Sequence, residues 1–165
     1  MKHTKKLLTW ILVAVLVVTT VALVACVDKP KTITLDDLQL PEMDSDQSAI
    51  IIKNRNDTYT VHIVTVGGKG TDATTVEGVL DYLADLGMLQ YSANGTMLSD
   101  VGNLNPDSDA REYVALYTSV QSDWGQGASA TAYKIGDVSV GYSGCGFKEM
   151  KFEAGALIYF ELQTW

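Results

Sequence analysis

The chain has 165 residues and a formal net charge of −8, with 12 Lys and Arg against 20 Asp and Glu. This length is that of one domain with short extensions. The negative charge argues against a nucleic-acid-binding surface, because phosphates are bound by Lys and Arg, and against a surface that lies flat on anionic lipid.

The first 26 residues have the pattern of a secretory signal. Three lysines among the first six residues precede an apolar run over residues 7–25, and small residues stand before the expected cleavage site. The ending Leu23-Val24-Ala25-Cys26 resembles the lipobox of bacterial lipoproteins, in which the cysteine is diacylglycerylated and the chain is cut just before it. We therefore predict a signal peptide at residues 1–25 and a lipid on Cys26 that holds the protein on the extracytoplasmic face of the cell membrane.

The alternative is an uncleaved membrane anchor, because an apolar run of 19 residues is just long enough to span a bilayer. In both cases the lysines place the rest of the chain outside the cell. Residues 26–47 then read as a flexible acidic tether, with Pro30, Pro41 and six acidic residues. Within them, residues 32–35 have the composition of a short strand.

The folded domain is expected at residues 48–165 and begins with a β-hairpin. Residues 49–53 are continuously apolar up to a final lysine, residues 54–57 have turn chemistry, and residues 58–66 alternate. A helix over residues 76–86 follows, because its apolar residues recur on one helical face. Thr74 and Glu77 have capping-box spacing, with Thr74 as the N-cap, and Gly87 is placed to cap the C-terminus.

The rest of the chain is rich in short strands separated by turns. We predict strands at residues 88–91, 96–98, 111–120, 131–135, 138–142, 148–152 and 157–162. The order of elements predicts an α+β fold: a β-rich mixed sheet with one packed helix, similar to a β-grasp.

Four segments of the domain carry motifs of a known family. Residues 74–80 resemble its T-T-V-x-D-A-L helix start, and residues 91–104 resemble its Y-x-x-T-x-I-N-G-L stretch. Residues 113–117 stand in place of its W-W-x-Y strand, and residues 146–160 resemble G-x-x-x-Y-x-V-x-D-G-D-x-I-x-F. Together they resemble the C-terminal domain of transcobalamin and intrinsic factor and its relatives on bacterial lipoproteins, over residues 48–162.

The resemblance implies an extracytoplasmic binding module, with cobalamin or a related corrinoid as one candidate ligand. In transcobalamin this domain caps a cobalamin that a separate helical domain holds, and this sequence has no such helical domain. Tyr113 replaces the usual Trp, residues 153–156 replace Asp-Gly-Asp, and residues 120–143 stand where the family often has a short loop. The family's ligand contacts are therefore not carried over to this chain.

The sequence has no residue set typical of an enzyme or a metal site. Once the signal is removed, His62 is the one histidine, and no second His or Cys lies at ligand spacing. Cys145 lies between two glycines, with no basic residue within two positions to lower its pKa. We expect both residues to be structural, the alternatives being an axial metal ligand and a reactive thiol, and we expect no catalytic residue, no metal and no cofactor.

Aromatic residues gather in and beside residues 120–143, and five of them are the candidate ligand-binding residues. Trp124 lies in a predicted loop, where an aromatic ring offers a flat contact surface of low conformational entropy. Small residues follow it, so we expect Trp124 to be the most exposed of these rings in the free protein. The alternative is that the rings pack over the sheet and close the core. The five candidates are Tyr117, Trp124, Tyr133, Tyr142 and Phe147.

Two functions are compatible with the sequence. The first is a lipoprotein that binds a small molecule, such as a corrinoid, and passes it to a membrane transporter. The second is an interaction or adhesion module for a protein or a cell-wall polymer, without a small ligand. An enclosed aromatic pocket near Trp124 would favour the first, and a flat exposed apolar patch would favour the second.

Overall fold

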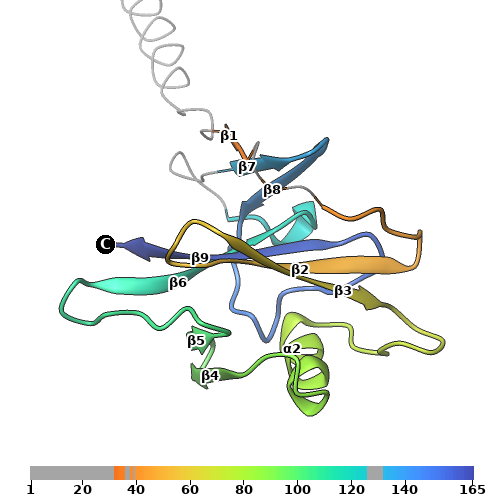
Figure 1. Cartoon of the computed structure of the whole chain (residues 1–165), viewed down its shortest axis with the longest axis horizontal. Helices are drawn as coiled ribbons and strands as arrows, with labels where there is room; N and C mark the ends of the chain where they lie inside the picture. Colours follow the sequence, from red (N-terminus) through yellow and green to blue (C-terminus); the bar gives the residue numbers. More distant parts are fainter. Residues whose placement is uncertain (1–31, 36–37, 39, 126–131) are drawn as a thin grey trace, which may run out of the picture. The chain divides into compact units, whose positions relative to one another are not determined.

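A seven-stranded mixed sheet runs through the part of the chain that the computed structural model describes, namely residues 32–35, 38, 40–125 and 132–165 (Figure 1). The strand order is β1-β7-β8-β6-β9-β2-β3. Strands β1 and β7 are parallel, as are β2 and β9, and the other pairs are antiparallel. The strands are β1 (Thr32–Thr34), β2 (Gln47–Lys53), β3 (Tyr59–Thr65), β6 (Glu112–Thr118), β7 (Ala132–Ile135), β8 (Val138–Tyr142) and β9 (Leu157–Thr164).

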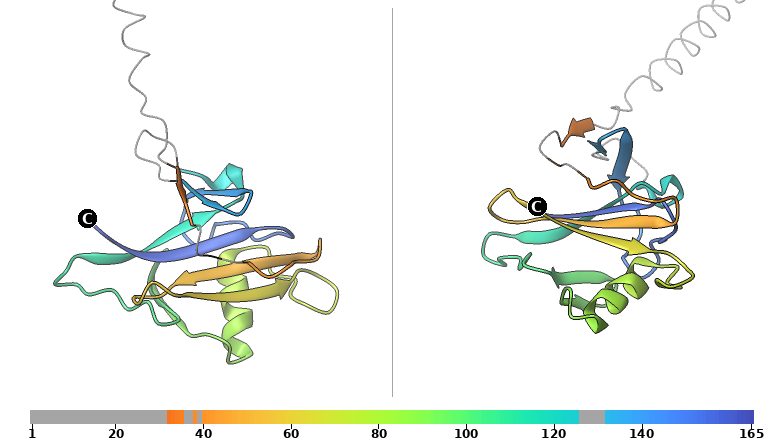
Figure 2. Two further views of the ribbon diagram at one scale, coloured as in Figure 1. Left: turned by 45° about the horizontal axis from the view of Figure 1, so that its top comes forward. Right: turned by 45° about the vertical axis from the view of Figure 1, so that its right-hand side comes forward.

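One α-helix and a separate two-stranded hairpin lie on one side of strands β6, β9, β2 and β3, and the β7–β8 part of the sheet bends toward the other side (Figure 2). The helix is α2 (Val76–Asp85), the hairpin strands are β4 (Tyr91–Asn94) and β5 (Met97–Val101), and a short 3-10 helix, η1, covers Gln121–Asp123. The predicted α+β class, a β-rich mixed sheet with one packed helix, is confirmed. Among the described residues, no helix is long and apolar enough to cross a membrane.

Strand β2, which lies between β9 and β3, is buried on both faces, and this explains its unbroken apolar sequence. Successive side chains of a strand point to opposite faces, so Ile50 and Ile52 enter one core and Ala49 and Ile51 enter the other. A strand that is covered on both faces needs apolar residues at every position. We call the two cores the helix-side core and the tyrosine-side core.

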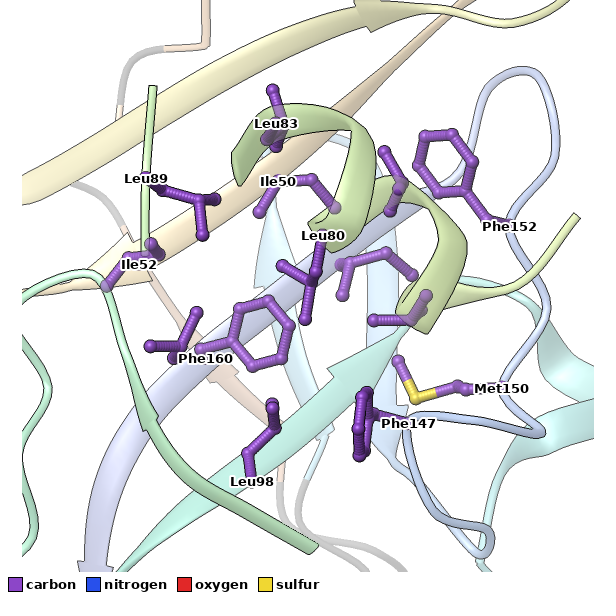
Figure 3. Close-up of a cluster of buried hydrophobic side chains, with 14 of the residues drawn as sticks. Ile50, Ile52, Leu80, Leu83, Leu89, Leu98, Phe147, Met150, Phe152 and Phe160 are labelled. Carbon is purple, nitrogen blue, oxygen red and sulfur yellow. The ribbon is translucent and has the colours of Figure 1, made fainter. Parts of the chain in front are cut away.

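The helix-side core forms where α2 lays its apolar stripe on the sheet. Val76, Val79, Leu80 and Leu83 are all buried, and Figure 3 shows Leu80 and Leu83 pointing toward the strand residues beneath them. The stripe therefore lies on the face that the sequence predicts. Labelled partners in the figure are Ile50, Ile52, Leu89, Leu98, Phe147, Met150, Phe152 and Phe160.

The helix begins one residue later than the predicted capping box requires. The N-cap is Thr75, whose hydroxyl oxygen accepts a hydrogen bond from the Gly78 N–H at 3.3 Å. The Thr74 C=O instead accepts the N–H of Phe152 at 2.9 Å, so tertiary contacts hold Thr74 outside the helix. Gly87 does close the helix as predicted, since it adopts a φ of +69°, which glycine tolerates best.

The tyrosine-side core recruits residues that the sequence assigns to a tether. Leu38 is only 8% exposed, and Leu35, Leu40 and Met43 pack against the same core. The Leu35 N–H donates to the Lys134 C=O at 3.0 Å, which extends the pairing of β1 with β7. The expectation of a flexible tether over residues 26–47 is therefore wrong for residues 32–35, 38, 40 and 43, because these leucines cover apolar surface of the sheet. The predicted short strand at residues 32–35 is confirmed as β1.

Residues 148–152, predicted as a strand, form a turn followed by a single bridge. The Met150 N–H donates to the Gly146 C=O at 3.0 Å, and Lys151 bridges only to Thr75. Met150 and Phe152 are buried against α2. The alternation of apolar and polar residues in this segment therefore reflects the packing of a loop onto the helix. The predicted signal peptide and Cys26 lie outside the described residues.

Candidate functional site

Strand β6 is fully paired on one edge but only partly paired on the other. β9 pairs with all of Glu112–Thr118, whereas β8 pairs with Tyr117 and Thr118 alone. β8 ends at Tyr142. The Ser143 N–H still donates to the Leu116 C=O at 2.8 Å, and beyond Ser143 the chain no longer pairs with β6. The first half of β6 is therefore left without a strand neighbour on this edge.

A pocket of about 230 Å³ lies beside this open edge. Its walls come from β6, from β5 with the turn before it, and from the segment that leaves β8. None of the lining residues is charged, in a chain whose net charge is −8. An ionised group would be desolvated there without a partner, so the pocket suits an uncharged ligand. The lining residues are Thr96, Met97, Leu98, Tyr113, Val114, Leu116, Tyr142, Ser143, Gly144, Cys145 and Gly146.

Close backbone approaches shape the wall around Cys145. A Cβ atom at Gly146 would lie 2.7 Å from Cβ of Thr96, and one at Gly144 would lie 2.8 Å from Cα of Gly125. Glycine at both positions lets this segment touch the β4–β5 turn on one side and the end of η1 on the other. Cys145 is half-buried between them, with its Sγ 3.6 Å from the Ser143 Oγ.

The structure divides four of the five predicted aromatic residues between the two cores. Tyr117 meets Tyr133 and Tyr142 in the tyrosine-side core, with ring centroids 4.8 Å and 5.4 Å apart. Phe147 is fully buried in the helix-side core, edge-on to Tyr91 at 6.0 Å. These residues therefore do not form one site. Of the five, Tyr142 lines the pocket.

Trp124 is a packing residue. It is half-buried, as is Tyr142, whereas the other three candidate rings are buried. Its Nε1–H donates to the Thr118 C=O at 2.7 Å. The indole lies flat on Gly141, where a Cβ atom would be only 2.5 Å from the ring. The ring thus fastens η1 to the sheet, as the core-closing alternative predicts, while ligand binding by the candidate residues stays a prediction.

A buried carboxylate organises the tyrosines of the second core. Glu161 is 7% exposed and accepts hydrogen bonds from the hydroxyls of Tyr133 and Tyr159 at 2.5 Å and 3.0 Å. Gln163 donates to the same carboxylate at 2.9 Å and to the Tyr117 hydroxyl at 2.6 Å. Burial first, and the Glu161 charge second, raise the pKa of Tyr117 and of Tyr159.

The alternation of residues at the end of the chain is a sequence signal for this network. Tyr159 and Glu161 alternate with apolar residues along the predicted strand 157–162, and Gln163 continues the alternation one residue beyond it. Residues two apart share a face of a sheet. By contrast, nothing local indicates that Thr96, Met97 and Leu98 meet Tyr113, because the β4–β5 hairpin reaches β6 only through the packing of the helix-side core.

The described residues contain no group of three or more His, Cys, Asp or Glu side chains placed to hold a metal ion. His62 lies on β3, half-buried, and burial lowers its pKa. Its strand partner is Ile50 of β2. His62 and Cys145 thus lie on different elements, β3 and the segment after β8, and the structure does not bring either into a ligand cluster.

No protein-family model and no curated protein sequence matches this chain. Among solved structures, the chain is similar to a proposed metal-binding protein from Ruminococcus gnavus ATCC 29149. The similarity covers 73% of this chain and 98% of that chain, with 9% sequence identity and a TM-score of 0.48. A similarity at this level carries no inference about function. The resemblance to the transcobalamin C-terminal domain has no support from a family model.

Proposed function

We propose that this chain is a lipoprotein, anchored through Cys26 on the extracytoplasmic face of the membrane, that binds a small uncharged ligand in the pocket beside β6. The observation that supports binding is the pocket itself, about 230 Å³ and without a charged lining residue. Apolar and aromatic walls with a few polar groups are the usual composition of a small-molecule site. Tyr113, Tyr142 and Met97 supply the apolar and aromatic walls, and the unpaired backbone of β6 supplies the polar groups.

The volume restricts what can be enclosed. Sites for drug-sized ligands measure roughly 300–1,000 Å³, so this pocket holds one ring or one side chain of a ligand. A corrinoid, the ligand that the family resemblance suggests, would place one edge in the pocket and lie mostly outside it. A corrinoid therefore stays a candidate as a ligand that is only partly enclosed. Anchoring through Cys26 would keep the protein at the membrane, where it could pass this ligand to a transporter.

The test is a titration of the full chain in lipid nanodiscs with indole, cobinamide and cobalamin, followed by calorimetry. Met97 lines the pocket and is 55% exposed, so Met97→Lys should introduce a charge without disturbing the core. Val138, at the end of a different hairpin and 41% exposed, gives the matched control Val138→Lys.

The proposal expects at least one probe to bind, and expects Met97→Lys but not Val138→Lys to weaken it at least about fivefold. If no probe binds at about 1 mM, or if both variants bind like the original chain, this assignment of function fails.

A second candidate function, an interaction module, is favoured by a separate surface. Leu86 and Met88, on either side of the turn that ends α2, are both more than half exposed. Large apolar residues exposed next to one another often mark a protein interface. The double variant Leu86→Ser and Met88→Ser should abolish attachment of the purified chain to isolated cell walls, and unchanged attachment would remove this candidate.

A further inference from the structure

The residues of β6 direct their backbone groups alternately to opposite edges of the strand. Odd-numbered residues face β9, because the Ser119 N–H, one residue past the strand, donates to the Leu157 C=O at 2.9 Å in the register of the pair. Even-numbered residues face the opposite edge, where the Leu116 C=O accepts the Ser143 N–H at 2.8 Å. Val114 is even-numbered, so its N–H and C=O point toward the pocket side.

Within the described part of the chain, these two groups of Val114 have no strand to pair with. β8 reaches only Tyr117 and Thr118, and Glu112, two residues before Val114, donates its N–H to the Asp107 C=O at 3.0 Å. The Val114 side chain is buried in the helix-side core, so its backbone is the polar part that it presents to the pocket. A donor and an acceptor held side by side at a strand edge match the backbone of another extended chain.

The pocket wall opposite β6 indicates which side chains an added strand would carry. Met97, Tyr142 and Cys145 line the pocket together with the β6 residues, and none of the lining residues is charged. Because successive side chains of an extended chain alternate in direction, a strand paired with Val114 would direct every second side chain to the pocket face. The volume of about 230 Å³ suits one such side chain and is too small for a drug-sized ligand.

We propose, resting on the small-ligand function above, that the ligand is an extended, uncharged peptide segment that adds a short strand to the open half of β6. It forms hydrogen bonds with the N–H and C=O of Val114 and inserts one apolar or aromatic side chain between Met97, Tyr142 and Cys145. β1 and β3 end the sheet, but none of the residues that line the pocket belongs to either strand. The joint presence of an open backbone and a side-chain pocket therefore selects β6.

The test uses acetylated and amidated pentapeptides Thr-Xaa-Thr-Xaa-Thr, with Leu or Phe at Xaa, and the full chain in lipid nanodiscs. Two matched peptide series carry N-methyl groups, one on the residues at positions 2 and 4 and the other on the residues at positions 1, 3 and 5. Since only alternate amides of an added strand face its neighbour, one methylated series should bind about tenfold more weakly while the other keeps its affinity. Hydrogen exchange in residues 112–118 should slow when the parent peptide binds.

The outcomes separate this inference from the function on which it rests. Equal affinity of the two methylated series, or no protection of residues 112–118, overturns strand addition. Peptides that fail at about 1 mM while indole binds in a Met97-dependent way overturn the peptide ligand and leave the small-ligand function standing. Failure of indole, the corrinoids and the peptides together removes both. Peptide binding that is lost as the protein concentration rises assigns this edge to a second copy of the chain and overturns the peptide ligand.

Discussion

Tyr133 and Glu161 meet in the tyrosine-side core, where the Tyr133 hydroxyl donates a hydrogen bond of 2.5 Å to the Glu161 carboxylate. Tyr133 lies on β7 and Glu161 on β9, and in the sheet order β8 and β6 stand between these two strands. The bond therefore crosses over two strands and fixes the β7–β8 hairpin above the tyrosine-side core. It also places Tyr142, the residue where β8 ends, at the pocket wall.

Replacing Tyr133 by Phe should lower the free energy of unfolding by about 1–3 kcal/mol, because a buried carboxylate loses a donor that water does not replace. Urea unfolding of the chain measures this. Tyr82→Phe is the control, since Tyr82 is half-buried and its hydroxyl makes no hydrogen bond among the described residues. Equal losses for the two variants would show that the Tyr133–Glu161 bond does not stabilise the fold.

Leu80 is fully buried beneath α2 (Figure 3). Leu80→Ala should cost about 2–5 kcal/mol, because it removes buried methyl groups and leaves a cavity. Leu86, at the end of the same helix and more than half exposed, provides the control Leu86→Ala, which should change stability by less than about 0.5 kcal/mol. A loss below that value for Leu80→Ala contradicts the packing of the helix on the sheet.

A chain that starts at residue 44 should be much less stable than one that starts at residue 30. The longer chain keeps β1 and the buried Leu38, whereas the shorter one exposes the apolar surface that they cover. The thermal midpoints of the two chains should differ by several degrees, since about 1 kcal/mol shifts the midpoint of a domain of this size by roughly 3–6 °C. Coincident midpoints would restore the interpretation of residues 32–43 as a tether.

Burial lowers the pKa of His62, so the unfolded chain binds a proton at a higher pH than the folded chain does. The contribution of His62 to the free energy of unfolding is therefore fully present above its pKa in the unfolded chain, about 6.5. It is lost as the pH falls from there through its pKa in the folded chain. Urea unfolding between about pH 7.5 and 5 should show this decline. His62→Gln should flatten it, and an unchanged slope in that variant would assign the dependence to other groups.

We expect cleavage between Ala25 and Cys26 and a lipid on the Cys26 thiol. Intact-mass analysis of the membrane fraction should show a mature chain that begins at a diacylglycerylated Cys26, and Cys26→Ser should abolish this species. A mature chain that begins at Met1 would instead support the uncleaved anchor.

Local chemistry was enough to predict the hairpins and the helix. Gly136 and Asp137 stand between two short apolar strands, and β7 and β8 pair across them with Ile135 opposite Val138. The spacing of Val76, Val79, Leu80 and Leu83 fixes the buried face of α2. These elements depend on residues a few positions apart, so their pattern survives in the sequence.

The pocket depended on contacts that no local pattern carries. Val114 is a residue of a predicted strand, but its open edge exists only because β8 ends at Tyr142, two pairs after it joins β6. Where β8 ends, Trp124 packs on Gly141 and forms a bridge with Ser143. These contacts join two segments that are separated in the sequence by the β7–β8 hairpin. Sequence by itself therefore determined the hairpins, the helix and the residues on its buried face, and it predicts the export signal. The tertiary structure alone decided which edge stayed unpaired, because strand pairing and ring packing are settled by long-range fit.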